Sequence, residues 1–262
     1  MKTFLIFLTA VFSLRAGITD ADSIVNSLIQ SRNTVRTLSC RIKVFYEETG
    51  RLSRRFEGEG YYKKSDGKEK LILNYFSPAR EHFISRADTV IYYAPENKTA
   101  MVFDVNKSGK IDREILKQSG RLVDNTLRSM RDSYNFSIKT TVGDSALVLE
   151  AEPKGGWVNF SAIYVKVNKN KNALTVIEIY GKDGSIVSQT VFSDFEKVPG
   201  TDYFFPSVRH DFAAAGTVPR KIKTIYSRLV FNEPVSDSVF YPEIPEDVKY
   251  IRPGAEQGSA DD

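Results

Sequence analysis

The second half of the chain is a series of short apolar segments separated by turn residues. Its separators, such as Val142-Gly143-Asp144 and Gly181-Lys182-Asp183-Gly184, are short and rich in Gly, Asn and Asp. Such separators favour hairpins between consecutive strands, so an antiparallel sheet is predicted. The strand-like segments are residues 136–141, 146–151, 160–167, 174–180, 186–195, 202–212 and 220–231.

The first half combines two helical segments with further strands. Apolar side chains recur at three- and four-residue steps over residues 22–38, which predicts an amphipathic helix with Asp20 or Asp22 as its N-cap. A second helical stretch, interrupted near Gly120, is predicted at residues 112–134. Strand-like runs lie between the helices, at residues 39–46, 55–63, 70–76, 82–85 and 90–93. The predicted fold class is mainly β (α+β): a strongly curved antiparallel sheet with an N-terminal helix and a helical insertion.

The first residues have the layout of a secretory signal peptide. Lys2 precedes an apolar run at residues 4–14 that is too short to cross a bilayer as a helix. We expect a signal peptide at residues 1–17, the alternatives being an uncleaved anchor or a buried helix. One domain is expected at residues 18–253, including a C-terminal extension at 199–253. Residues 254–262 contain no large apolar side chain and are expected to form a flexible tail.

The composition argues against several classes of protein. With 37 Lys and Arg against 33 Asp and Glu, the net charge of +4 is too small to neutralise many phosphates, so we expect no nucleic-acid partner. The single cysteine excludes an internal disulfide and a CxxC metal site. His82 and His210 are the only histidines, which excludes a histidine-rich zinc site. We expect neither a metal nor a cofactor.

Two motifs that are typical of binding or catalysis are incomplete. Residues 104–112 match the first nine positions of a calcium loop, but Ile115 stands where the bidentate Glu is needed. Gly143-Asp144-Ser145-Ala146 is similar to the start of a GDSL-type hydrolase signature, yet no Asp stands three residues before His210. Carboxylate pairs such as Glu57 and Glu59 fit a solvated strand face. We therefore predict that the chain is not an enzyme.

Alternation along the strands indicates which side chains share a face. Ile163, Val165 and Val167 lie on one face of their strand, and Ile177 and Ile179 do so on the next. Phe192 lies opposite Val191 and Ser193. Because both faces of several strands are apolar, the sheet is expected to be covered on both sides or curled around something.

The order of several motifs resembles the LolA-like family of periplasmic outer-membrane lipoprotein carriers. The first helix and strand are followed by Gly58-Glu59-Gly60-Tyr61-Tyr62-Lys63-Lys64, and then by Leu71-Ile72-Leu73-Asn74-Tyr75-Phe76-Ser77-Pro78. Asp88-Thr89-Val90-Ile91-Tyr92-Tyr93-Ala94-Pro95 stands where the family has a DGxxxWxYxP type of pattern. Strands at residues 146–195 complete the likeness, which covers about residues 20–198.

The resemblance implies an unclosed half-barrel with a helical lid over a hydrophobic cavity. It assigns Leu122, Leu127 and Met130 to the lid, and Lys64 stands near the position of an Arg that ties the family's lid shut. Sheltering a sixteen-carbon acyl chain from water is worth roughly 12 kcal/mol, at about 0.8 kcal/mol per methylene. The residues that we expect to bind the hydrophobic ligand are Ile72, Ile163, Val165, Val167, Ile177, Ile179 and Phe192.

The resemblance also implies where and with what the protein acts. We expect a non-enzymatic carrier or chaperone in the periplasm that binds the acyl chains of lipoproteins or another lipid. An inner-membrane releasing complex and an outer-membrane receptor are the implied partners. The alternative is a periplasmic regulatory module that senses lipoproteins and acts on a membrane partner. The extension at residues 199–253 either enlarges the sheet, docks a partner or reflects a different lipid client.

Overall fold

A computed structural model of the chain describes residues 20–48, 51–86, 89–104, 126–143, 145–155, 160–214 and 219–252. The predicted signal peptide, Leu122 and the predicted tail lie outside these ranges. Most of the calcium-loop-like segment also lies outside them, and of that segment Asp104 is described, as the last residue of a strand.

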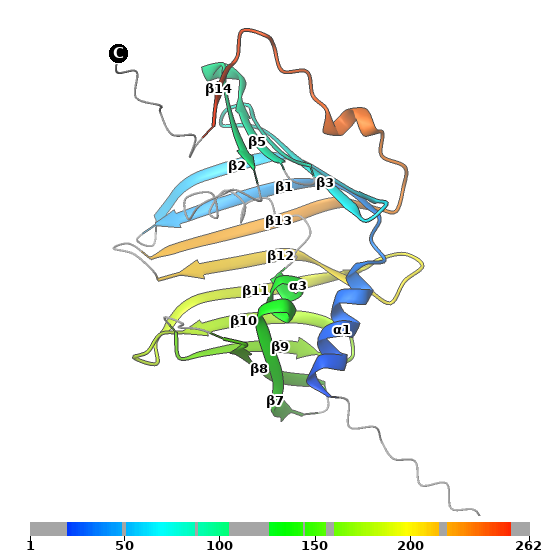
Figure 1. Cartoon of the computed structure of the whole chain (residues 1–262), viewed down its shortest axis with the longest axis vertical. Coiled ribbons are helices and arrows are strands. Elements are labelled where there is room, and N and C mark those ends of the chain that lie inside the picture. The colour runs from blue at the N-terminus through cyan, green and yellow to red at the C-terminus, as the bar shows by residue number, and fades with distance from the viewer. Residues whose placement is uncertain are drawn as a thin grey trace, which may run out of the picture.

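The described strands form one fourteen-stranded sheet that does not close into a barrel (Figure 1). Their spatial order is β14-β6-β5-β4-β3-β2-β1-β13-β12-β11-β10-β9-β8-β7, so β14 and β7 are the two edges. All neighbours are antiparallel except β14 and β6, which are parallel. The strands are β1 (Thr37–Glu48), β2 (Arg51–Ser65), β3 (Lys68–Ser77), β4 (Glu81–Arg86), β5 (Thr89–Ala94), β6 (Thr99–Asp104), β7 (Tyr134–Val142), β8 (Ala146–Pro153), β9 (Ala162–Asn168), β10 (Ala173–Tyr180), β11 (Ile186–Lys197), β12 (Phe204–Ala213), β13 (Arg220–Phe231) and β14 (Lys249–Ile251).

Two series of sequential strands build the sheet, and one strand pair joins them. Strands β1 to β6 follow one another in space as they do in sequence, and so do β7 to β13. The seam is the pairing of β1 with β13, which runs from Leu38 opposite Phe231 to Glu48 opposite Arg220. The C-terminal extension supplies β12 and β13 at the centre of the sheet, and it also supplies the edge strand β14.

The N-terminal helix α1 spans Ala21–Arg32. The Asp20 carboxylate accepts a hydrogen bond of 2.6 Å from the Ser23 backbone N–H, which confirms one of the two predicted N-caps and lowers the pKa of Asp20. The helix is shorter than predicted. Asn33 is its C-cap, and Leu38, predicted as helical, lies in β1 opposite Tyr62 and Phe231. Pairing with two neighbouring strands overrides the local helical pattern there.

A second described helix, α3, spans Thr126–Ser133. It lies at the end of the segment that was predicted to be helical, and Tyr134, also predicted as helical, instead begins β7. Both helices lie over the half of the sheet that contains β7 to β11 (Figure 1). Their apolar side chains pack with those of β8 to β11 in one buried cluster.

The strap, residues 232–248, connects β13 to β14 and covers part of one face of the sheet, over β2 to β5. Phe240, fully buried in the 3-10 helix η2 (Asp237–Phe240) of this strap, packs against Ile72 and Ile84. Leu71 and Leu73 flank Ile72 on β3 but belong to a different buried cluster. Because successive strand residues alternate in direction, the strap covers the face opposite to Leu71 and Leu73.

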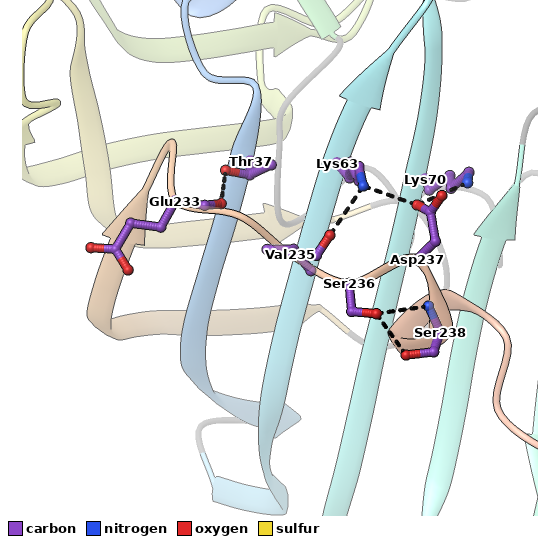
Figure 2. A network of polar contacts seen from close by, with 8 residues as sticks. All are labelled: Thr37, Lys63, Lys70, Glu233, Val235, Ser236, Asp237 and Ser238. Carbon is purple, nitrogen blue, oxygen red and sulfur yellow. Dashed lines mark hydrogen bonds and ion pairs between the residues drawn. The ribbon is translucent and has the colours of Figure 1, made fainter.

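Polar contacts hold the strap along β1, β2 and β3 (Figure 2). The Thr37 hydroxyl donates a hydrogen bond of 2.6 Å to the Glu233 carbonyl oxygen, and Lys63 Nζ donates one of 3.0 Å to the Val235 carbonyl oxygen. Lys63 and Lys70 both pair with the Asp237 carboxylate, at 3.0 and 3.2 Å. Asp237 is largely exposed, so its ion pairs contribute little, and the buried side chains Phe240 and Val248 anchor the strap.

Candidate functional site

The buried cluster beneath α1 contains most of the residues predicted to bind a hydrophobic ligand. Ile163, Val165 and Val167 of β9 are all buried in it, as predicted from alternation. Ile177 of β10 and Phe192 of β11 belong to the same cluster. Ile179 is partly buried and packs against the cluster's edge. The structure therefore brings six of the seven predicted residues together.

Ile72 is the exception among these seven. It is fully buried beneath Phe240 of the strap, in a separate cluster with Ile84. The structure does not bring it together with the β9, β10 and β11 residues.

An apolar cavity of about 50 Å³ lies between the two helices and the sheet. Of the residues predicted from sequence, Phe192 and the lid residue Leu127 line it, while Met130 is buried in the surrounding cluster. Its apolar wall is formed by side chains from α1, α3, β10 and β11, namely Leu28, Ile29, Leu127, Leu174, Phe192 and Phe195. A cavity of this size has room for only a few water-sized groups.

Sequence reasoning missed the part of the cavity near the turn between β11 and β12. Phe195 lines the cavity together with Phe192, although residues three apart in a regular strand point to opposite faces. Between them Asp194 has a φ of +51°, in the left-handed region, which breaks the regular alternation. Phe204 and Pro206 of β12 also line the cavity, and Pro206 lies opposite Phe195 in the strand pairing. In the sequence, the aromatic residues on either side of Pro199-Gly200 could have indicated this part of the cavity wall.

Basic side chains close one side of the cavity. Arg32, at the end of α1, is 8% exposed, and both it and Arg128 of α3 line the cavity wall. Arg32, Lys64 and Arg128 each form an ion pair with Glu69, at N–O distances of 3.7 to 3.8 Å. Burial, together with the positive charges of Arg128 and Arg32, outweighs the attraction of Glu69 and lowers the pKa of Lys64.

Lys64, the predicted lid-locking residue, lies near the end of β2 and contacts the C-terminus of α1. Its Nζ donates a hydrogen bond of 2.9 Å to Asn33 Oδ1 at the C-terminus of α1. Arg128 Nη2 of α3 donates one of 2.9 Å to the same oxygen. Lys64 is therefore linked to α3 indirectly, because Lys64 and Arg128 both bind the Asn33 side-chain amide and both pair with Glu69.

The turn between β9 and β10 holds the other side of α1. Asn172 Nδ2 donates hydrogen bonds to the Ser27 and Ser31 hydroxyl oxygens, at 2.9 and 2.8 Å. The preceding residue, Lys171, places its Nζ over the rings of Phe195 and Phe204, 5.3 and 5.9 Å from their centroids. A cation therefore also lies beside the aromatic part of the cavity wall.

The described residues include neither a membrane-spanning helix nor a metal-binding cluster. No helix there combines the length and the apolar character that crossing a bilayer requires. No group of three or more His, Cys, Asp or Glu side chains among these described residues is arranged to hold a metal ion.

Solved structures share this architecture at low sequence identity. A DUF1329 family protein from Desulfovibrio piger aligns with a TM-score of 0.63 and 17% identity over 84% of this chain and 96% of its own. A LolA superfamily protein from Nitrosomonas europaea aligns with a TM-score of 0.55 and 13% identity over 84% of this chain and 97% of its own. An outer membrane lipoprotein-sorting protein domain from Vibrio parahaemolyticus aligns with a TM-score of 0.55 and 13% identity over 81% of this chain and 94% of its own. The chain has a LolA-like fold.

The sequence itself matches no protein-family model and no curated protein. The likeness therefore rests on the fold, and it confirms the predicted class: a curved, unclosed antiparallel sheet with an N-terminal helix and a second, short helix. In this LolA-like fold the apolar cavity lies between those helices and the sheet, at the position where a lid over a cavity was expected.

Proposed function

We propose that this protein is an exported periplasmic carrier that shelters acyl chains, of lipoproteins or of another lipid, between α1, α3 and the sheet. The observation that carries the proposal is the apolar cavity covered by α3. The LolA-like fold supports it, because such a sheet and its helices can enclose a hydrocarbon without any catalytic group. Delivery towards the outer membrane, with a releasing complex and a receptor, belongs to the same proposal.

The cavity must widen to accept a chain, and α3 is the element that can move. Its eight residues are too few for a helix to be stable by itself. Leu127 and Met130 are buried side chains of α3, and burying each contributes about 1.5–3 kcal/mol. Sheltering a sixteen-carbon chain is worth roughly 12 kcal/mol. Binding of the chain therefore outweighs the loss of those two contacts.

Binding of an acyl probe to a polar variant of the wall tests the proposal. Asn in place of Phe195 puts an amide against the hydrocarbon at a partly buried position, and we expect affinity for a fluorescent sixteen-carbon acyl probe to fall about tenfold or more. Phe76→Asn is the matched control, because Phe76 on β3 is half exposed.

Probe titration and thermal melting would be measured on all three proteins. Equal affinities for Phe195→Asn, Phe76→Asn and the unchanged protein would refute the cavity as the binding site. Failure of the unchanged protein to take up any acyl probe, combined with capture of one membrane protein, would favour the sensing module instead.

Tethering α3 to α1 tests whether α3 moves. Arg131 Nη1 donates a hydrogen bond of 3.4 Å to Asn26 Oδ1, so cysteines at these two exposed positions can be joined by a short, cleavable thiol crosslinker. We expect the tether to slow probe uptake at least about tenfold, because the chain cannot enter while the cover is fixed. Adding reductant should restore the rate.

The native thiol does not interfere with this design. Cys40 is buried in β1, and burial raises the pKa of its thiol to about 12, so it stays unreactive in the folded protein. Each single-cysteine variant, Arg131→Cys or Asn26→Cys, treated with the same reagent serves as the control. Unchanged uptake in the tethered protein would show that chains enter without movement of α3.

A further inference from the structure

The wall of the cavity is apolar on one part and basic on another. Leu28 and Ile29 face it from α1, and Arg32 lines it three to four residues further along the same helix. Residues at this spacing lie on one face of a helix, so the apolar and basic groups are neighbours. Arg128 brings a second guanidinium to the wall from α3.

A nearly buried arginine is costly unless an anion is close. Within the described part of the chain, the Glu69 carboxylate takes part in the ion pairs of Arg32, Lys64 and Arg128. Their distances of 3.7 to 3.8 Å exceed the 2.7–2.9 Å that is typical of charge-assisted hydrogen bonds. Burial is the main cause of the lowered pKa of Lys64, and the positive charges of Arg128 and Arg32 add to it.

We propose that the lipid taken up in this cavity carries an anionic head group, a carboxylate or a phosphate, that binds Arg32 and Arg128. Its hydrocarbon tail lies against Leu28, Ile29 and the phenylalanine rings. The inference rests on the proposed carrier function and names the class of lipid carried. A guanidinium is suited to this role, because its planar donors match both oxygens of a carboxylate or phosphate.

Charge complementarity also argues against a neutral amphiphile. A neutral head group placed beside Arg32 would desolvate the guanidinium further without supplying a counter-charge. An anionic head group supplies that charge. Lys171, over the rings of Phe195 and Phe204, adds attraction for an anion approaching from the side of the β9–β10 turn.

The test compares three probes of equal chain length on the full mature chain: hexadecanoic acid, hexadecyl phosphate and hexadecanol. Each displaces a neutral fluorescent acyl probe, and inorganic phosphate is measured alongside them. Because hydrogen bonds to charged groups contribute about 1.5–3 kcal/mol, we expect both anionic probes to bind roughly tenfold or more tightly than hexadecanol. Inorganic phosphate should not displace the probe.

Variants then locate the head group. Arg32→Gln should reduce the preference for the anionic probes to within about threefold while leaving hexadecanol binding unchanged, because it removes the charge and not the apolar wall. Arg128→Gln, at a half-exposed position, should act in the same direction. It provides the test if Arg32→Gln does not fold. Arg41→Gln is the matched control, since Arg41 on β1 is exposed and pairs with Glu59 at 4.0 Å.

The outcomes separate this inference from the carrier proposal. If none of the three probes binds, the carrier proposal fails and the inference fails with it. If all three bind equally, the carrier proposal stands and the anionic head group is refuted. Displacement by inorganic phosphate as strong as that by hexadecyl phosphate would mean a site for free anions, and it would also overturn the inference. The inference would also be overturned if both arginine variants kept the full preference for the anionic probes over hexadecanol.

Discussion

Replacing Phe240 by alanine is expected to lower the free energy of unfolding by about 3–5 kcal/mol, the cost of removing a large, fully buried aromatic side chain. Phe240 is 0% exposed and packs against Ile72 and Ile84, which are also fully buried. Its loss would leave a cavity between the strap and the sheet. Chemical denaturation followed by circular dichroism measures the change.

Tyr241→Ala is the matched control for Phe240→Ala. Tyr241 is the next residue, is half exposed, and has the Lys70 ammonium and the Arg86 guanidinium near its ring, at 5.2 and 4.1 Å from the centroid. Exposed contacts of this kind contribute about 0.5–1 kcal/mol each, so a small loss is expected. Equal losses for the two variants would mean that the strap is not anchored through Phe240.

Gly58→Ala is expected to destabilise the protein by about 3 kcal/mol, because the added methyl group has no room. A Cβ at Gly58 on β2 would come within 2.3 Å of the Asn74 carbonyl oxygen on β3. The atom in the way is backbone, so relief requires β2 and β3 to separate at the register shift between Glu57 and Gly58. This first glycine of the Gly58-Glu59-Gly60 motif is therefore required by packing between strands. The midpoint of chemical denaturation reports the loss.

Gly155→Ala is the control for Gly58→Ala. A Cβ at Gly155 meets no atom within 4 Å, and its φ lies outside the left-handed region. We expect a change within about 1 kcal/mol, in the stabilising direction, because alanine restricts the unfolded chain. A similar loss in both variants would show that the close contact at Gly58 relaxes at little cost.

The sheet could be predicted from sequence because its signals are local. Short Gly- and Asn-rich turns join consecutive strands, and β8 to β11 lie next to one another in that order. The alternation in Ile163, Val165 and Val167 directly reports the covered face of β9. The helix ends were predicted less well. Leu38 continues the helical spacing of α1, but its place in β1 depends on Phe231, which lies far along the chain.

The site was only partly predictable, for two physical reasons. Both faces of β3 are apolar, so alternation could not show that Ile72 lies beneath the strap while Leu71 and Leu73 lie in another cluster. The basic part of the cavity wall is assembled from Arg32, Arg128 and Lys64, which belong to three separate elements. No spacing in the sequence brings such residues together, because tertiary packing alone does so.

The seam between β1 and β13 makes the two ends of the domain depend on each other. Each series of strands can form from contacts between sequence neighbours, but Leu38 cannot meet Phe231 until nearly the whole domain has been synthesised. Until β13 appears, β1 has an open edge, and so does the last strand made of the series that begins with β7; such edges are templates for pairing with other chains. A polypeptide emerging from a ribosome or a translocation pore with its N-terminus first therefore remains two separate half-sheets, vulnerable to aggregation, until its last strands appear.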